Sequence, residues 1–258
     1  MTDTNLPALS LIVPALNEEE VVKRVIDEIY AVASKNLSRF EIILIDDGSI
    51  DTTPDIFENI AKLNPQYTFI KNPRNLGLGE SFKIGVNKAK YEYVMLLCGD
   101  GGMPAASLPA IFNLIGKEDL VIPYVTNLKK IKTQHRYALS KSYTFLLNTI
   151  FNLNIKYFNG LPVYPTEMLR KITITNSGFG FQAEILITLI KSGCTYSEVG
   201  VKGAEETGNS TAVSLKNLYT IFITFIRLVF KIASSHVLPK EEMERIRANL
   251  KGKPQKND

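Results

Sequence analysis

The stretch Val94–Gly102 (VMLLCGDGG) ends a short apolar run at Asp100, an acid surrounded by glycines. Short, partly β-branched runs that stop at glycines are typical of strands buried on both faces. Gly99 and the glycines after Asp100 let the backbone and a bulky anionic ligand approach closely, and a carboxylate binds divalent cations through oxygen. Because ligands of open α/β sheets bind where strands end, this stretch predicts a binding site. The alternative is a tight turn that Asp100 merely caps.

A second pair of acids follows another predicted strand. The nearly all-apolar run Phe40–Ile45 leads directly into Asp46 and Asp47. Two adjacent carboxylates at a strand end are costly without a partner. The Ser, Asp and Thr residues just after them can cap the following helix alone, which leaves Asp46 and Asp47 free for a ligand. If they have no ligand, helix capping is the alternative role for this pair.

A glycine-rich loop, Asn72–Gly79, follows the predicted strand Tyr67–Lys71, and Arg74 in this loop could pair with a phosphate. The loop lacks the full glycine spacing of a dinucleotide-binding motif and does not follow the first strand, which argues against a nicotinamide enzyme. No glycine- and basic-rich loop follows the first strand, so the sequence also gives no support for a nucleotidyltransferase.

The elements that must position these residues alternate between strand and helix. Asp3 stands where a signal peptide would carry Lys or Arg, so we interpret Leu9–Val13 as the first strand. Asn17 is predicted to open the first helix, with three glutamates in its first turn. This alternation predicts an α/β fold with a mostly parallel central sheet flanked by helices. Later predicted elements are a strand at Leu120–Pro123, a helix at Tyr137–Phe151 and a strand at Glu198–Val201.

Composition limits the class of protein. With 258 residues, 45% hydrophobic and 22% charged, the chain can bury a large core, and a disordered chain is excluded. A net charge of +4 suits anionic ligands or a membrane surface but is too weak to argue for nucleic acid. Cys98 and Cys194 have no metal-ligand spacing, which favours a reducing cytoplasmic setting and leaves a disulfide open.

Residues 215–233 form the most apolar predicted helix, with a narrow polar stripe that includes Arg227 and Lys231. These charges interrupt the run before it reaches the ~20 apolar residues that span a bilayer. The apolar face can pack on the domain, on a second copy or on a membrane surface, and we favour the membrane. The predicted organisation is a domain at 1–212, an amphipathic helix at 213–236 and a charged, solvated tail at 237–258.

Four stretches occur in a characteristic order: IVPALNEEE, IILIDDGSIDTT, NPRNLGLGES and a strand ending in GD. Together they resemble the family 2 glycosyltransferases with the GT-A fold, and among these the polyprenyl- and dolichyl-phosphate sugar synthases. The resemblance is strong over Leu9–Met103 and weaker to about Ala233. It implies transfer of a sugar, with inversion, from a nucleoside-diphosphate sugar to a lipid phosphate or a glycan.

The resemblance also implies roles for matching residues on the donor side. Asp100 would hold Mg²⁺ or Mn²⁺ on the donor diphosphate, although Cys98 replaces the first acid of the family's metal-binding motif. A thiol is a poor ligand for a hard cation, so metal affinity is expected to be lower, or the cation rests on Asp100, phosphate and water. The segment from Lys202 to Ser210 would close over the donor. The base and ribose of the nucleotide would be held by Pro14, Leu16, Glu18 and Asp47.

On the acceptor side, Arg136 matches a family position that faces phosphate, and it lies in a basic run that could instead be solvated. The helix at Tyr137–Phe151 is either core or an acceptor-lipid face. A lipid phosphate needs no strong base, whereas a hydroxyl acceptor does. Glu184, in a stretch that resembles the family's acceptor-side helix start, is the candidate base, and its alternative is a helix-surface glutamate.

Two other classes stay open. A nucleotide-sugar-binding protein without turnover is favoured by Cys98 and by Glu205 and Glu206, acids in the loop expected to grip diphosphate. The other is a scaffold in a polysaccharide or glycolipid assembly. If the protein is an enzyme, we expect it to be cytoplasmic and bound peripherally to the inner face of the membrane. A homo-oligomer stays open. The glycosyl-transfer interpretation requires Asp47 and Asp100 to converge on one site.

Overall fold

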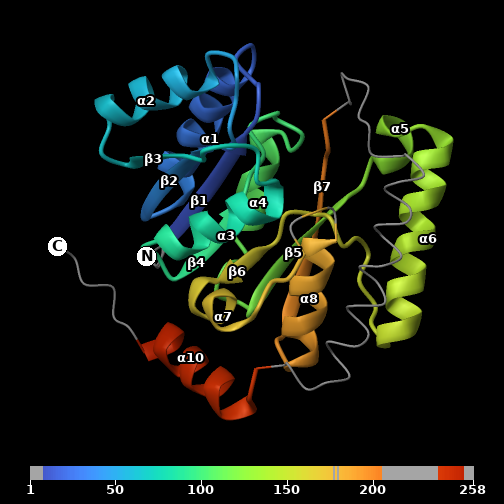
Figure 1. The fold of residues 1–258 in the computed structure, drawn as a ribbon. Coiled ribbons are helices and arrows are strands. Elements are labelled where there is room, and N and C mark those ends of the chain that lie inside the picture. Colours follow the sequence, from blue (N-terminus) through green and yellow to red (C-terminus); the bar gives the residue numbers. More distant parts are fainter. Residues whose placement is uncertain (1–7, 177, 179, 205–237, 253–258) are drawn as a thin grey trace.

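The computed structural model describes residues 8–176, 178, 180–204 and 238–252. Within them the central feature is a seven-stranded sheet, ordered β3-β2-β1-β4-β6-β5-β7, with helices on both faces (Figure 1). The strands are β1 (Ala8–Ala15), β2 (Arg39–Asp46), β3 (Tyr67–Lys71), β4 (Tyr93–Leu96), β5 (Leu120–Val125), β6 (Val163–Pro165) and β7 (Tyr196–Val201). The helices are α1 (Val22–Asn36), α2 (Thr53–Leu63), α3 (Leu78–Lys88), η1 (Ala105–Ser107), α4 (Leu108–Phe112), α5 (Leu128–Ile131), α6 (Gln134–Phe151), α7 (Thr166–Lys171), α8 (Phe181–Lys191) and α10 (Lys240–Gly252).

Strand β1 organises the half of the sheet that carries the predicted site. It pairs in parallel with β2 on one side and with β4 on the other. Ala15, its last residue, lies opposite Asp46, the last residue of β2. The loops that follow β1, β2 and β4 therefore leave the sheet at one shared edge, as the predicted parallel arrangement requires.

The other half of the sheet breaks the parallel pattern. The three-residue strand β6 pairs antiparallel with both β4 and β5, and β5 pairs in parallel with β7. Strand β6 is not among the predicted elements, because a run this short carries too little periodicity to be recognised. The α/β class with a mostly parallel sheet is confirmed, and this antiparallel insertion is the exception.

The two faces of the sheet bury separate apolar layers. One layer is made with α1, α2 and α4 and is represented by Ile26, Phe57 and Phe112. The opposite layer is made with α3, α6, α7, α8 and α10 and includes Phe82 and Phe181. These side chains are almost wholly inaccessible to water, and their burial is the main source of stability for the sheet that positions the site.

Helix α1 begins later than the sequence indicates. Asn17 was expected to open the helix, but α1 starts at Val22 and has no acidic residue in its first turn. Asn17 instead adopts a left-handed backbone conformation with φ of 55°. Its backbone N–H donates to Ser49 Oγ at 2.9 Å, and its side-chain Oδ1 accepts from the Ile50 N–H at 2.9 Å. The residue therefore joins the β1 loop to the β2 loop rather than capping a helix.

The C-terminal helix α10 is packed against the domain rather than solvated. Met243 and Ile246 are 2% and 0% exposed, and both belong to the apolar layer that also contains the side chains of α8. Cys194 Sγ lies 3.6 Å from Met243 Sδ, and both cysteines of the chain are free thiols. Arg247 Nη2 reaches back to Asp119 Oδ2 at 2.5 Å and to the Gly193 carbonyl at 2.7 Å. The expectation of a solvated tail is thus wrong for the side of α10 on which Met243 and Ile246 lie.

Replacing Arg247 with methionine is expected to lower the free energy of unfolding by about 1–3 kcal/mol, because the largely buried Asp119 carboxylate would lose its charged partner. Burial alone would raise the pKa of Asp119, but hydrogen bonds from Arg247 and Thr195 hold it below its ordinary value. This stabilisation is present above the unfolded-state pKa of about 4 and disappears as pH falls through the lower folded-state pKa. Urea unfolding at pH 7 and in strong acid measures both effects.

The matched control is Arg245→Met on the same helix. Arg245 is half exposed and pairs with Glu167 and Glu242 at the surface, so its loss should cost less than about 1 kcal/mol. Equal losses for the two variants at pH 7, or an Arg247 effect that persists unchanged in strong acid, would show that the Asp119 pair does not hold α10.

Candidate functional site

The loops after β1 and β2 are joined into one unit by hydrogen bonds. The Glu18 N–H donates to Thr53 Oγ1 at 2.9 Å, and the Glu19 N–H donates to Asp51 Oδ2 at 3.2 Å. In return, Glu19 Oε2 accepts from the N–H and hydroxyl of Thr52 at 2.9 and 2.6 Å. Contacts made in both directions fix the two loops relative to each other, so Glu18 is held at the sheet edge.

Asp47 is an anchor for the glycine-rich loop. It is 5% exposed, and its carboxylate accepts four hydrogen bonds. The donors are Asn72 Nδ2 at 2.8 Å, Ser81 Oγ at 3.0 Å, and the N–H groups of Leu76 and Gly77 at 3.0 and 2.9 Å. The expectation of a free carboxylate is therefore wrong, because charge-assisted bonds to the loop already occupy it. A contact between Asp47 and a nucleotide stays a prediction.

Asp46 is also unavailable to a ligand, since it is wholly buried. One carboxylate oxygen accepts from the Ser49 N–H at 3.1 Å, and the other has no hydrogen-bond partner among the described residues. Nearby, Gly48 has φ of +82°, and a Cβ there would lie 2.4 Å from the Arg74 carbonyl carbon. This close contact needs glycine, and it places exposed Arg74 directly against the β2 loop.

Asp100 projects from the loop that leaves β4 beside the end of β1. The Gly99 N–H donates to the buried Pro14 carbonyl at 3.0 Å, and a Cβ at Gly99 would lie 2.8 Å from Ala15 Cβ. Only glycine lets the two loops approach this closely. Asp100 itself is exposed, and its Oδ1 accepts from the Gly102 N–H at 2.9 Å. This intraloop bond is the turn-capping alternative predicted from the sequence, and it leaves the carboxylate open to solvent.

Negative charge gathers around this loop. Burial raises the pKa of Glu18, and the carboxylates of Asp100 and Asp51 raise it further. Burial, together with Asp100 and Glu18, also raises the pKa of the Cys98 thiol, so Cys98 is neutral at pH 7. Glu18 and Asp100 are therefore near enough for their charges to interact. Asp47 also follows a strand that ends at this sheet edge, but its carboxylate is bonded to the 72–77 loop. The strand ends that carry Asp47 and Asp100 therefore converge as expected, whereas the structure does not bring the two carboxylates together.

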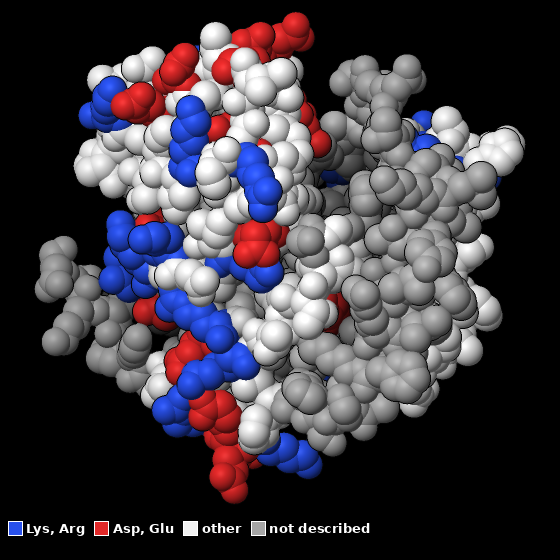
Figure 2. Space-filling model, in the orientation of Figure 1, with Lys and Arg blue, Asp and Glu red and all other residues white. Residues whose placement is uncertain are grey.

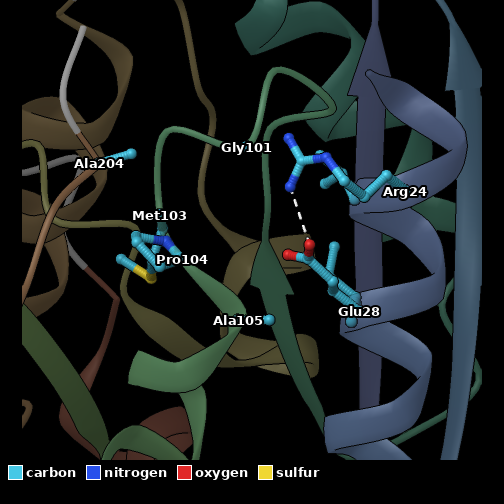
Figure 3. Close-up of a pocket in the computed structure, with 9 residues that line it drawn as sticks. Arg24, Glu28, Gly101, Met103, Pro104, Ala105 and Ala204 are labelled. Carbon is cyan, nitrogen blue, oxygen red and sulfur yellow. Dashed lines mark hydrogen bonds and ion pairs between the residues drawn. The ribbon is translucent and has the colours of Figure 1, made fainter. Parts of the chain in front are cut away.

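A small pocket lies behind the Asp100 loop, between α1 and residues 101–105 (Figure 3). Its volume is about 160 Å³, well below the roughly 300–1,000 Å³ of pockets that enclose drug-sized ligands. Arg24 and Glu28 form an ion pair of 2.8 Å at its wall. This pocket is therefore too small to enclose a ligand of that size.

The segment expected to close over the donor begins beside this pocket. The Ala204 N–H donates to the Gly102 carbonyl at 3.2 Å, and Ser107 Oγ donates to the Lys202 carbonyl at 3.1 Å. The start of this segment is therefore bonded to Gly102, which lies two residues after Asp100 in the sequence. Leu16, another predicted donor residue, is partly buried in the β1 loop. Residues 205–210, with both glutamates, lie outside the described part of the chain, as does the helix predicted at 213–236.

Glu184 is a buried residue that orders the loop before α8. It is 3% exposed, so the helix-surface alternative is wrong. Its carboxylate accepts from the Thr175 N–H and hydroxyl at 2.9 and 2.8 Å and from the Asn176 N–H at 2.9 Å. A carboxylate in the first turn also suits the positive end of the helix dipole. Its role as a catalytic base stays a prediction.

Two lysines contact tyrosine side chains in the half of the fold that contains β5 and β7. Lys156 Nζ lies 4.5 Å from the centroid of the Tyr124 ring and 3.4 Å from Glu198 Oε2. Lys132 Nζ lies 3.4 Å from Tyr157 Oη. Tyr124 and Lys156 are far apart in sequence, so no local pattern could have paired them. Arg136 is partly buried in the first turn of α6 and is not free of contacts.

Protein side chains alone do not complete a metal centre. Within the described residues, no three His, Cys, Asp or Glu side chains lie close enough together to hold a metal ion. In the same described part of the chain, no helix is both long enough and apolar enough to cross a bilayer. A cation at Asp100 would therefore need further ligands from outside these described side chains.

Solved structures with a similar fold include glucosyl-3-phosphoglycerate synthase from Mycobacterium tuberculosis in complex with Mn²⁺, uridine diphosphate and phosphoglyceric acid. It aligns with a TM-score of 0.62 and 18% identity, covering 86% of this chain and 78% of that one. At this identity the likeness establishes the fold, which is GT-A. The predicted fold is thus confirmed.

Curated relatives are similar over part of their length. A dolichyl-phosphate beta-glucosyltransferase from Trichomonas vaginalis is 27% identical over 51% of this chain and 42% of its own. A cholesterol galactosyltransferase from Borreliella burgdorferi is 34% identical over 41% of this chain and 28% of its own. The matched stretches thus span less than half of these relatives. The model of the family described as glycosyl transferase family 2 matches residues 10–175, well over half of the sequence, and the chain therefore belongs to the family 2 glycosyltransferases.

Proposed function

We propose that this chain transfers a sugar, with inversion, from a nucleoside-diphosphate sugar to a lipid phosphate or a glycan. The observation that carries the proposal is the exposed Asp100 carboxylate, in a loop that Gly99 holds against the end of β1, at the edge where β1, β2 and β4 all end. Family membership and the uridine diphosphate complex of the structural neighbour support a nucleotide-sugar donor. Pro14, Leu16, Glu18 and Asp47 are proposed to line the nucleotide end of the donor, with Arg74 near its phosphates.

A divalent cation suits the residues at this edge. Burial raises the pKa of Glu18, repulsion from Asp100 and Asp51 raises it further, and a bound diphosphate would add more negative charge. A cation held by Asp100, beside Glu18, would offset both. Bound Mg²⁺ or Mn²⁺ supplies a counter-charge for the leaving diphosphate. Cys98, kept protonated by burial and its acidic neighbours, contributes no anionic ligand, so the affinity for metal is expected to be modest.

A lipid phosphate is the acceptor that best suits the described residues. Such an acceptor is already ionised and needs no base, which agrees with a Glu184 carboxylate already occupied by hydrogen bonds to Thr175 and Asn176. Arg136 would face its phosphate. The dolichyl-phosphate relative supports this class, whereas the cholesterol relative keeps a hydroxyl acceptor open, for which Glu184 is the proposed base. A lipid acceptor places the protein on the cytoplasmic face of a membrane.

The neutral thiol at Cys98 specifically favours a second candidate, a nucleotide-sugar-binding protein without turnover. In that case a nucleoside diphosphate would stabilise the fold, but the sugar would never leave the donor. A scaffold role in a polysaccharide or glycolipid assembly would require neither binding nor turnover. These three candidates differ in simple measurements.

Thermal-shift assays with UDP, GDP, CDP and dTDP, each with and without Mn²⁺, test the proposal. We expect one nucleotide to raise the Tm, and Mn²⁺ to increase that shift, since binding to the folded state alone stabilises it. The corresponding nucleotide-sugar should then release its diphosphate when a polyprenyl phosphate is added. A shift without release would favour the binding protein, and the absence of any shift would contradict both.

A further inference from the structure

Helix α6 leaves three large apolar side chains uncovered. Phe145, Leu146 and Ile150 are 72%, 46% and 42% exposed. The opposite side of the same helix is buried in the core, through Thr144, Leu147 and Phe151. The two possibilities raised by the sequence, core or lipid face, thus apply to different sides of one helix. Exposed apolar side chains grouped in this way are typical of an interaction surface.

The segment of the chain that contains this face carries basic side chains and no acidic ones. Residues 120–166 contain no Asp or Glu, whereas Lys129 and Lys130 on α5 and Lys141 on α6 are exposed. Lys141 lies one helical turn before Phe145, so it borders the apolar side chains. By contrast, Figure 2 shows positive and negative side chains intermixed over the side of the molecule that carries α2 and α10. In the described part of the chain, net positive charge therefore lies beside the apolar side chains of α6.

We propose that the outward face of α5 and α6 docks on an anionic membrane surface. Amphipathic helices of this kind insert their apolar side chains ~5–10 Å into the boundary of the headgroups, while bordering lysines attract anionic lipids. The inference rests on the described residues of this face and does not depend on sugar transfer or on residues 213–236.

A second copy of the chain is a poorer occupant for this face. A twofold contact would bring the same patch of each copy together, so Lys129, Lys130 and Lys141 would meet lysines of the other copy. Like charges that are brought together in this way oppose association. An anionic bilayer satisfies both the apolar and the basic side chains at once.

Vesicle co-flotation of the full chain tests the proposal. We expect binding to vesicles of phosphatidylcholine with phosphatidylglycerol, weaker binding to phosphatidylcholine alone, and a decrease with salt. Phe145→Ser with Ile150→Ser should weaken binding at least about tenfold. Lys129→Gln with Lys130→Gln should remove most of the preference for phosphatidylglycerol.

The matched control is Ile50→Ser with Leu63→Ser, two apolar side chains that are 95% and 87% exposed elsewhere on the surface. This control should float like the unmodified protein. All variants should keep the Tm and any nucleotide-dependent thermal shift, which separates membrane docking from the proposed donor binding.

Three results would overturn the proposal: no flotation of the unmodified protein, flotation of the Phe145 and Ile150 variant at its original level, or an equal loss in the control. A dimer in light scattering that the Phe145 and Ile150 substitutions dissociate would assign the face to a second copy instead. Binding to an acidic soluble protein without binding to vesicles would likewise exclude the membrane.

Discussion

Asp100→Ala is expected to abolish the Mn²⁺-dependent part of the nucleotide-induced thermal shift and to lower sugar transfer by about 10²- to 10³-fold. The physical reason is that the exposed Asp100 carboxylate is the proposed protein anchor for the cation, and the neutral Cys98 thiol cannot replace it. The shift given by nucleotide without metal should remain, because the loops at the ends of β1 and β2 are unchanged. Thermal-shift titrations and a diphosphate-release assay measure the two effects.

The fold should tolerate this change. Asp100 makes one intraloop bond, to the Gly102 N–H, so the Tm without ligand should stay close to that of the unmodified protein. Asp55→Ala, which removes an exposed acid from the first turn of α2, serves as a control and should keep the metal-dependent shift. If Asp100→Ala retains the full metal-dependent shift, the cation does not rest on Asp100.

Asp47→Ala should lower the free energy of unfolding by about 3–4 kcal/mol, because it strands several buried donors at once. Asn72 and Ser81 would lose a charged acceptor in the interior, and the N–H groups of Leu76 and Gly77 would lose their partner. This is a large part of the ~5–15 kcal/mol that stabilises a typical domain. Urea unfolding followed by circular dichroism gives the difference directly.

Asp47→Asn provides a graded comparison, since it keeps one acceptor oxygen and should cost less than alanine. Asp27→Ala is the matched control, because Asp27 is an exposed acid paired with Lys23 on α1 and should change stability by no more than about 0.5 kcal/mol. An Asp47→Ala protein as stable as the Asp27→Ala protein would refute the anchoring role.

Local patterns predicted the parallel half of the sheet well. Tyr67–Lys71 was expected as a strand and is β3 with the same bounds, and Asp100 lies at the predicted strand end. Runs of buried β-branched residues that end at glycine or acid clusters carry this information in the sequence itself. The position of the site at the sheet edge followed from the strand order that such runs imply.

What the sequence could not supply is the pairing of distant polar groups. The side-chain donors to Asp47 come from residues 25 and 34 positions away, and nothing in local periodicity distinguishes an anchored carboxylate from a free one. The burial of Glu184, which contradicts the helix-surface alternative, was hidden for the same reason. The packing of α10 was more accessible, since Met243, Ile246 and Leu250 recur at helical spacing within a charged segment.

The ion pair between Asp119 and Arg247 joins residues that are 128 positions apart in the sequence. As the chain leaves the ribosome, β5 and α7 emerge long before α10, so Met168 and Cys194 must wait for Met243 to cover them. Native closure of this side therefore waits for α10, and a chain that stops before Lys240 would expose part of its interior to chaperones and proteases.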